Sequence, residues 1–362
     1  MAISEAQVQS ALREIVDPNT GKDLVAGKNI RNIRVDGNDV ALDVVFAYPA
    51  KSVADATRRQ VIGKLKTIPG AGNVSVNAYS KIVSHAVQSG VKLIPNVKNI
   101  IAVASGKGGV GKSTTAANLA LALAVEGASV GVLDADIYGP SQPMMLGIRG
   151  RPESLDGKTL EPMEAHGVQA MSIGFLIEVE QPMVWRGPMV TQALQQLLQE
   201  TRWRELDYLV VDMPPGTGDI QLTLAQQVPV TGAVIVTTPQ DIALIDARKG
   251  LKMFDKVGIP ILGIVENMSI HVCSKCGNAE PIFGEGGGAR MCKDYGVDFL
   301  GGLPLDIAIR EQADSGKPTV VSDPDGRIAE IYKTIARKIA LKIAEKAQDR
   351  SHLFPKIVIQ QT

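Results

Sequence analysis

The sequence predicts an α/β fold in which a doubly wound, mostly parallel sheet follows a small N-terminal α+β domain. Three observations support this prediction. From residue 99 onward, short apolar runs typical of strands buried on both faces alternate with longer segments of helical periodicity. A glycine-rich loop separates the first of these runs from the first helical segment. Before residue 80, the strand-like segments instead alternate apolar and polar residues, as in a sheet with one buried face.

The bulk composition excludes several classes of protein. The chain has 362 residues, enough for one large and one small domain, and its 38 basic and 38 acidic side chains cancel, which argues against a nucleic-acid-binding surface. No apolar run approaches the ~20 residues that a membrane span needs, and the first ten residues do not resemble a signal peptide. With only three cysteines, a disulfide framework is not expected. We therefore expect a cytoplasmic protein whose cysteines are free thiols, catalytic groups or metal ligands.

The first domain is expected over residues 1–79. Its pattern predicts an amphipathic helix, a hairpin of two strands, a second helix and a last strand, at residues 5–16, 30–35, 40–45, 53–67 and 73–77. The four residues between the first two strands, Asp-Gly-Asn-Asp, suit a hairpin turn. Residues 80–98 are interpreted as a linker, punctuated by Gly90 and Pro95.

The second domain is expected over residues 99–350, with a C-terminal tail at 351–362. Strands are predicted at 100–104, 129–133, 168–172, 208–212, 232–238, 261–265 and 297–300. Helices are predicted at 113–126, 188–200, 240–256 and 325–347. The last helix combines an isoleucine stripe with a basic face, and its glutamates favour an ordinary covering helix over one that lies on a membrane.

A phosphate-binding loop matching G-x-x-x-x-G-K-[ST] follows the first strand of this domain. It consists of Gly106, Lys107, Gly108, Gly109, Val110, Gly111, Lys112 and Ser113, and Thr114 comes next. The glycines allow backbone N–H groups to surround a chain of phosphates, Lys112 can reach the β- and γ-phosphates, and the Ser113 hydroxyl can ligate Mg²⁺. Lys107 adds a second cation, which suggests a phosphate bound by another subunit.

Acidic residues follow two of the predicted strands, at the sheet edge where ligands bind in parallel α/β folds. Asp212 is placed to hold Mg²⁺ through water, Asp134 to add contacts to the metal shell and Asp136 to orient the attacking water. Gly216 can offer its N–H to the γ-phosphate. Each acid taken alone is also compatible with a helix cap or turn. Asn267 is interpreted as a reader of the adenine edge, although a polar strand end is the alternative.

These motifs together resemble the Mrp/ApbC family of P-loop ATPases. The resemblance rests on residues 106–113 with Lys107, and on the segments 134–141, 212–219 and 266–269. It implies an ATP-hydrolysing iron–sulfur cluster carrier, related more distantly to septum-site, chromosome-partitioning and nitrogenase-iron-protein ATPases. It further implies a face-to-face homodimer in which Lys107 reaches the partner's nucleotide. Residues 1–79 resemble a small domain found in iron–sulfur assembly proteins, but residues 46–51 lack the cysteine that such domains often carry there.

Cys273 and Cys276 form a C-x-x-C pair, which is half of a four-ligand metal site. A two-fold dimer would bring two pairs together, and the resembled family places a [4Fe–4S] cluster in this way. Three alternatives remain open: a Cys₃His zinc knuckle that adds His271 and Cys292, a thiol–disulfide site, and an incidental pair. Cys292 is also interpreted as a buried small residue, and residues 283–288 as a mobile glycine-rich loop.

The favoured function is an ATP-hydrolysing carrier or scaffold that holds a labile [4Fe–4S] cluster between subunits. Its expected partners are a second copy, apo iron–sulfur proteins and cluster-assembly scaffolds, with neither nucleic acid nor membrane. The alternatives are a positioning ATPase that acts on a membrane or nucleoid, and a zinc-stabilised adaptor NTPase. Arg186 is equally compatible with a phosphate contact, a partner contact or a surface position.

Overall fold

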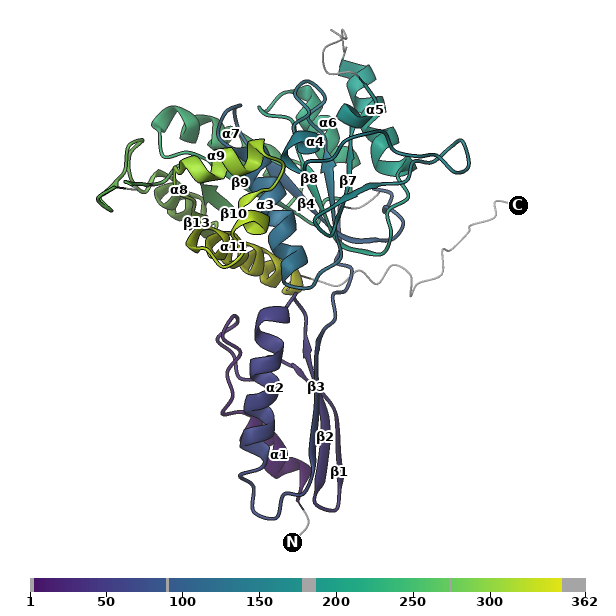
Figure 1. Cartoon of the computed structure of the whole chain (residues 1–362), viewed down its shortest axis with the longest axis vertical. Coiled ribbons are helices and arrows are strands. Elements are labelled where there is room, and N and C mark those ends of the chain that lie inside the picture. The colour runs from purple at the N-terminus through teal and green to yellow at the C-terminus, as the bar shows by residue number, and fades with distance from the viewer. Residues whose placement is uncertain (1–2, 89–90, 178–186, 274, 347–362) are drawn as a thin grey trace.

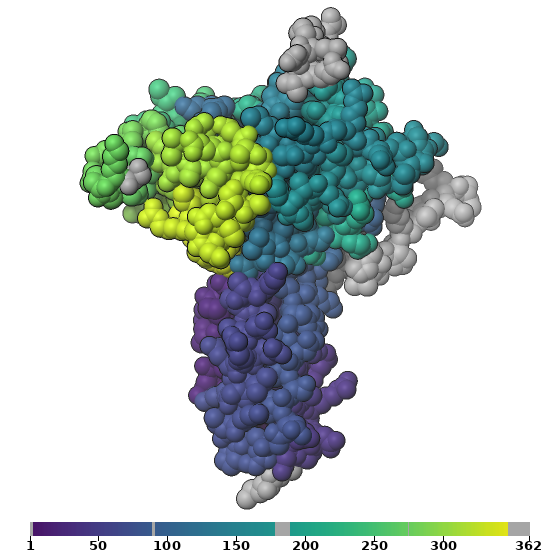
Figure 2. Space-filling view, in the orientation of Figure 1, coloured from purple at the N-terminus to yellow at the C-terminus, as the bar shows by residue number. Residues whose placement is uncertain are grey.

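A computed structural model describes residues 3–88, 91–177, 187–273 and 275–346. It contains a small domain built on a three-stranded sheet and a large domain built on an eight-stranded sheet (Figure 1). Figure 2 shows the small domain as a narrow stalk that meets one end of the larger body. Arg186 and the predicted tail at 351–362 lie outside the described residues.

The small domain packs two helices against one face of its sheet. Strand β2 (Asp39–Phe46) pairs antiparallel with β1 (Ile30–Asp36) and parallel with β3 (Val74–Ser80). Helix α2 (Lys51–Leu65) covers the sheet beside the shorter α1 (Glu5–Leu12), as Figure 1 shows. Helix α1 was predicted to extend to residue 16 but ends at Leu12. The chain turns after the cap at Arg13, and Val16 then pairs with Asp23.

The large sheet has the order β13-β10-β9-β4-β8-β5-β7-β6. All its pairings are parallel except the one between the edge strands β6 and β7. The strands are β4 (Val97–Ala104), β5 (Val130–Asp134), β6 (Met163–Ala165), β7 (Val168–Ser172), β8 (Leu206–Asp212), β9 (Gly232–Thr237), β10 (Ile261–Glu266) and β13 (Phe299–Gly302). This arrangement confirms the predicted doubly wound, mostly parallel sheet.

Helices cover both faces of this sheet. Helix α3 (Lys112–Val125) packs against α10 (Thr319–Ser322) and α11 (Arg327–Ala344), while α5 (Gly187–Glu200), α6 (Asp219–Gln227), α7 (Asp241–Lys256) and α8 (Gly287–Tyr295) form a second group. The buried positions of α11 include Ile335, Ile339 and Ile343, so much of its isoleucine stripe faces the core. No helix in the described part of the chain is both long and apolar enough to cross a membrane.

Several elements escaped sequence prediction. Helices α6 and α8 were missed, as were the short α4 (Gln142–Met145) and α9 (Ile307–Asp314). Helix α8 begins inside the run at 283–288 that was expected to be a mobile loop, so that expectation was wrong for its last two residues. Glycine has low helix propensity, and here tertiary contact compensates for it, because the buried Glu266 carboxylate accepts a hydrogen bond from the Gly288 N–H.

The two domains meet at Glu126, the residue that caps the C-terminus of α3. Its side chain is 2 % exposed. One carboxylate oxygen accepts from the Ser52 hydroxyl of α2 at 2.6 Å, and the other accepts from Arg337 of α11 at 2.8 Å. Because an unpaired buried carboxylate is costly, these bonds fix the start of α2 against the C-terminus of α3 and the middle of α11.

Candidate nucleotide and metal sites

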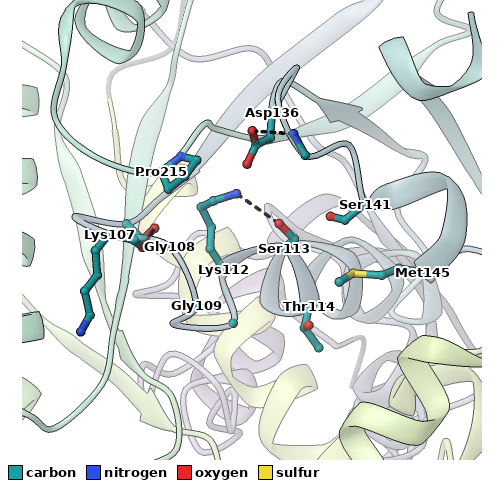
Figure 3. A pocket seen from close by; sticks show the side chains of 13 residues that line it. Lys107, Gly108, Gly109, Lys112, Ser113, Thr114, Asp136, Ser141, Met145 and Pro215 are labelled. Atoms are coloured by element: carbon teal, nitrogen blue, oxygen red, sulfur yellow. Dashed lines mark hydrogen bonds between the residues drawn. The ribbon is translucent and has the colours of Figure 1, made fainter. Parts of the chain in front are cut away.

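A cavity of about 260 Å³ lies at the carboxyl edge of the large sheet, between the phosphate-binding loop and the segment that follows β5 (Figure 3). Of the predicted site residues, it is lined by Lys107, Gly108, Gly109, Gly111, Lys112, Ser113, Thr114 and Asp136. Ser105, Gly139, Ser141, Met145 and Pro215 complete the lining. The loop joins β4 to α3, so the N-terminus of α3 opens directly onto the cavity, and such a terminus attracts anions.

Lys112 and Asp212 form an ion pair beneath this cavity, with side chains 6 % and 0 % exposed. The Lys112 ammonium also donates to the Ser113 hydroxyl at 3.2 Å. Gln142, which the sequence analysis did not single out, donates from Nε2 to the other oxygen of Asp212 at 2.9 Å. Both carboxylate oxygens of Asp212 are therefore occupied by side-chain donors.

Asp134 lies fully buried at the end of β5, beside Asp212. Burial and the negative charge of Asp212 raise the pKa of Asp134 to about 7. Its Oδ2 accepts from the backbone N–H groups of Ser141 and Gln142, each at 3.0 Å. Asp134 thus anchors the start of α4. Asp136 is half-buried and lines the cavity, and burial raises its pKa as well.

Three predicted residues support the loop rather than line the cavity. A Cβ on Gly106 would come within 2.2 Å of the Asp246 carbonyl carbon, so this glycine permits close packing against α7. Val110 is buried, and its carbonyl accepts a 2.9 Å bond from the Asn267 amide. Asn267 therefore braces the loop from behind in this structure, and its predicted contact with adenine stays a prediction.

Gly216 does not offer a free N–H to the cavity. It has a φ of +100°, and its N–H donates to the Ser105 carbonyl at 3.0 Å. The predicted contact of this N–H with the γ-phosphate stays a prediction. The neighbouring Pro215 lines the cavity instead. The bond from Gly216 ties the segment after β8 to the residue before the phosphate-binding loop.

Lys107 differs from Lys112 in direction. Figure 3 shows the Lys112 side chain reaching toward Ser113 and the cavity, whereas the Lys107 side chain points away from both. The Lys107 carbonyl accepts a hydrogen bond from the Ser105 hydroxyl at 2.8 Å, which fixes its backbone. The Lys107 side chain therefore does not extend over the loop's own phosphate site in this structure.

Cys273 and Cys276 lie on a small hairpin made by β11 (His271–Val272) and β12 (Ala279–Glu280). Two backbone bonds close its turn: the Cys273 N–H donates to Asn278 and the Gly277 N–H donates to the Cys273 carbonyl, both at 2.8 Å. The backbone N–H groups of Cys276 and Lys275 lower the pKa of the Cys273 thiol. Metals bind the thiolate, so this turn favours the ligating form.

The third cysteine, Cys292, has different surroundings from this pair. Cys292 is 5 % exposed inside α8, and burial with the nearby Glu266 charge raises its pKa to about 11. No group of three His, Cys, Asp or Glu side chains within the described residues is arranged to hold a metal ion. His271 is engaged through Nδ1 with the Leu305 carbonyl at 3.0 Å. The Cys₃His zinc knuckle considered from the sequence is therefore not formed.

The parallel sheet, the loop at the start of α3 and the paired Lys112 and Asp212 define a P-loop NTPase. Residues 96–340 match the ParA family model described as "NUBPL iron-transfer P-loop NTPase", and residues 5–77 match a model described as "Iron-sulfur cluster assembly protein". The chain therefore belongs to the family of NUBPL-type iron-transfer P-loop NTPases, and the resemblance to Mrp/ApbC proteins is confirmed.

Named relatives agree with this assignment. The chain is 61% identical over 274 residues to an iron-sulfur cluster carrier protein of Pseudomonas fragi, covering 75% of this chain and 96% of that one. It is 50% identical over 339 residues to the iron-sulfur cluster carrier protein of Escherichia coli strain K12, covering 93% and 92%. Among solved structures, an ADP complex of a nucleotide-binding protein from Archaeoglobus fulgidus is 37% identical, with a TM-score of 0.56 and coverage of 64% and 90%.

Proposed function

We propose that the protein is an ATP-dependent iron–sulfur cluster carrier that works as a homodimer in the cytoplasm, where thiols stay reduced. The cargo is a [4Fe–4S] cluster held between two copies of the cysteine hairpin and passed to apo-proteins. The observation that carries the proposal is the presence, in one domain, of a cavity lined by the phosphate-binding loop and half of a metal site. The names of the relatives at 61% and 50% identity support the same function.

The cavity suits Mg–ATP. Mg²⁺ prefers oxygen ligands and keeps several waters, and the Ser113 hydroxyl and the Asp212 carboxylate supply oxygens beside the phosphate-binding loop. On this proposal Lys112 would turn from Asp212 to the β- and γ-phosphates, and Ser113 and Asp212 would hold a Mg²⁺ that supplies positive charge beside Asp212. Asp136, which lines the cavity, orients the attacking water.

The homodimer is supported by two features that are each incomplete in one chain. Lys107 points away from its own phosphate site (Figure 3), which suits a contact with the partner's nucleotide. Cys273 and Cys276 supply two thiolates, whereas a cubane cluster takes four. A two-fold axis satisfies both features with one arrangement, because it duplicates every residue across the interface.

The test is anaerobic reconstitution with iron and sulfide, read by iron content, absorbance and the mass of the complex. The wild-type protein is expected to bind about two iron atoms per chain as a dimer, since four are shared by two chains. Cys273→Ala and Cys276→Ala are expected to lose the cluster. Cys292→Ala is the matched control and should retain it, because that thiol is buried within α8.

Three results would overturn the proposal. Iron bound equally well by Cys273→Ala would remove the hairpin from the site. One zinc per chain in the purified protein would favour the zinc-stabilised adaptor instead. Co-sedimentation with liposomes or DNA in the presence of ATP, without iron binding, would favour a positioning ATPase.

A further inference from the structure

The first residue of α4, Gln142, occupies an unusual position beside the nucleotide cavity. Its side chain is 1 % exposed, yet it is polar and uncharged. Long polar side chains are seldom buried this completely unless their hydrogen bonds are satisfied. The contacts of Gln142 therefore indicate what holds it there.

Gln142 contacts all three residues expected to face the metal. Its Nε2 donates to Asp212 Oδ2 at 2.9 Å and to the Ser113 carbonyl at 3.0 Å. Its backbone N–H donates to Asp134 Oδ2 at 3.0 Å. These partners come from the ends of β8 and β5 and from the start of α3. One residue thus joins three separate elements at the point where they converge.

The other amide atom of Gln142 is unsatisfied. Its Oε1 is buried and has no hydrogen-bond partner among the described residues, and the same holds for the neighbouring Ser141 hydroxyl, which lines the cavity. A buried acceptor without a partner is destabilising. Two adjacent unpartnered groups, of which the Ser141 hydroxyl lines the cavity, indicate that a ligand or its bound water completes them.

We propose that Gln142 is a positioning residue for Mg²⁺: its Nε2 orients Asp212, and its Oε1 accepts a hydrogen bond from a water in the metal's shell. The inference rests on the nucleotide chemistry of the proposed function and is independent of cluster binding. When Lys112 turns to the phosphates, Gln142 remains as the side-chain donor on Asp212. The metal is then recognised by an amide on α4 as well as by the phosphate-binding loop.

The experiment measures the affinity for fluorescent mant-ADP with Mg²⁺ and with EDTA, in the wild type and in Gln142→Leu. Leucine fills a similar volume but neither donates nor accepts. The lost hydrogen bonds involve a charged partner, Asp212. The factor by which Mg²⁺ increases the affinity for mant-ADP is therefore expected to fall about tenfold in the variant. Gln169→Leu is the control, because Gln169 also makes two amide hydrogen bonds, both to the Arg204 backbone, and lies near the start of β7, away from the carboxyl edge of the sheet.

Each result decides the question. A lower ratio of affinities with and without Mg²⁺ in Gln142→Leu, and an unchanged ratio in Gln169→Leu, supports the proposal. Equal weakening in both buffers leaves the ratio unchanged and would make Gln142 a packing residue only. Unchanged affinities in both buffers would also overturn the proposal. If the wild type showed no tightening by Mg²⁺, both this role and the ATPase chemistry would be rejected. Because no iron is present, a failure of the cluster-carrier function is detected separately, by reconstitution.

Discussion

The nucleotide cavity and the cysteine hairpin differ in how much of each site a single chain supplies. In the cavity, Lys112, Asp212 and Asp134 are nearly or fully buried and are held by hydrogen bonds from three elements. In the hairpin, Cys276 is exposed and the two thiols have no further ligand among the described residues. The first site is largely preorganised within the fold, whereas the second, on the proposed function, is completed by a second copy of the chain.

This difference has a physical basis in burial. A buried charge must be compensated inside the chain, so the residues of the cavity constrain one another. Half-buried and exposed thiols on a two-stranded hairpin carry no such requirement, since water can solvate them until a metal binds. A carrier benefits from this arrangement, because cargo held at an exposed site can be passed on without opening the core.

The largest expected effect comes from Lys112→Ala. It leaves the fully buried Asp212 carboxylate without its cation, so the free energy of unfolding should fall by about 3 kcal/mol and ATP affinity by about 100-fold. Iron content after reconstitution should not change, because the hairpin shares no residue with the cavity. Urea unfolding, nucleotide titration and iron analysis check this.

Lys275→Ala, which removes an exposed cation, is the control and should leave stability unchanged. Loss of iron in Lys112→Ala would show that the two sites are not separable.

A pair of glycine substitutions compares the rigidity of the two regions. In Gly106→Ala the new Cβ would lie 2.2 Å from the α7 backbone, so the loop or the helix must move. We expect a loss of about 2 kcal/mol and weaker ADP binding. Gly277→Ala in the hairpin has a φ of +72° but open space around the new atom, so it should cost only about 1 kcal/mol. Urea unfolding of both variants measures the difference. A larger loss of unfolding free energy in Gly277→Ala than in Gly106→Ala would contradict the view that the cavity is the more rigid region.

A smaller effect concerns pH. The pKa of Asp134 is raised to about 7 by burial and by Asp212, so the folded chain holds this proton more tightly than the unfolded chain. Stability from this group is present at low pH and is lost as pH rises through about 4 to 7. The neutral Asp134→Asn should therefore be more stable than the wild type at pH 8, by about 1 kcal/mol, and should lose this advantage toward pH 5. Thermal unfolding at the two pH values tests this prediction. It would be contradicted if Asp134→Asn were less stable than the wild type at pH 8.

Particular residues show how far sequence could predict these sites. Asp134, Asp136 and Asp212 were predicted together because the carboxyl ends of parallel strands meet at one edge of a sheet. Gln142 was not, because a glutamine in a segment between two motifs carries no signal of its own. Its importance arises from contacts with Ser113 and Asp212, 29 and 70 residues away. The bonds of Asn267 to Val110 and of Gly216 to Ser105 could not be predicted for the same reason.

The sequence alone determined the class of the protein, because strand periodicity, the glycine–lysine loop and the C-x-x-C pair are local patterns whose chemistry follows from residue type and spacing. Only the tertiary structure decided which side chains face the cavity and which brace it. It separated Cys292 from the cysteine hairpin and directed Lys107 away from Lys112. The physical reason is that hydrogen bonds and burial in a packed core join residues far apart in the chain, and no local pattern encodes those contacts.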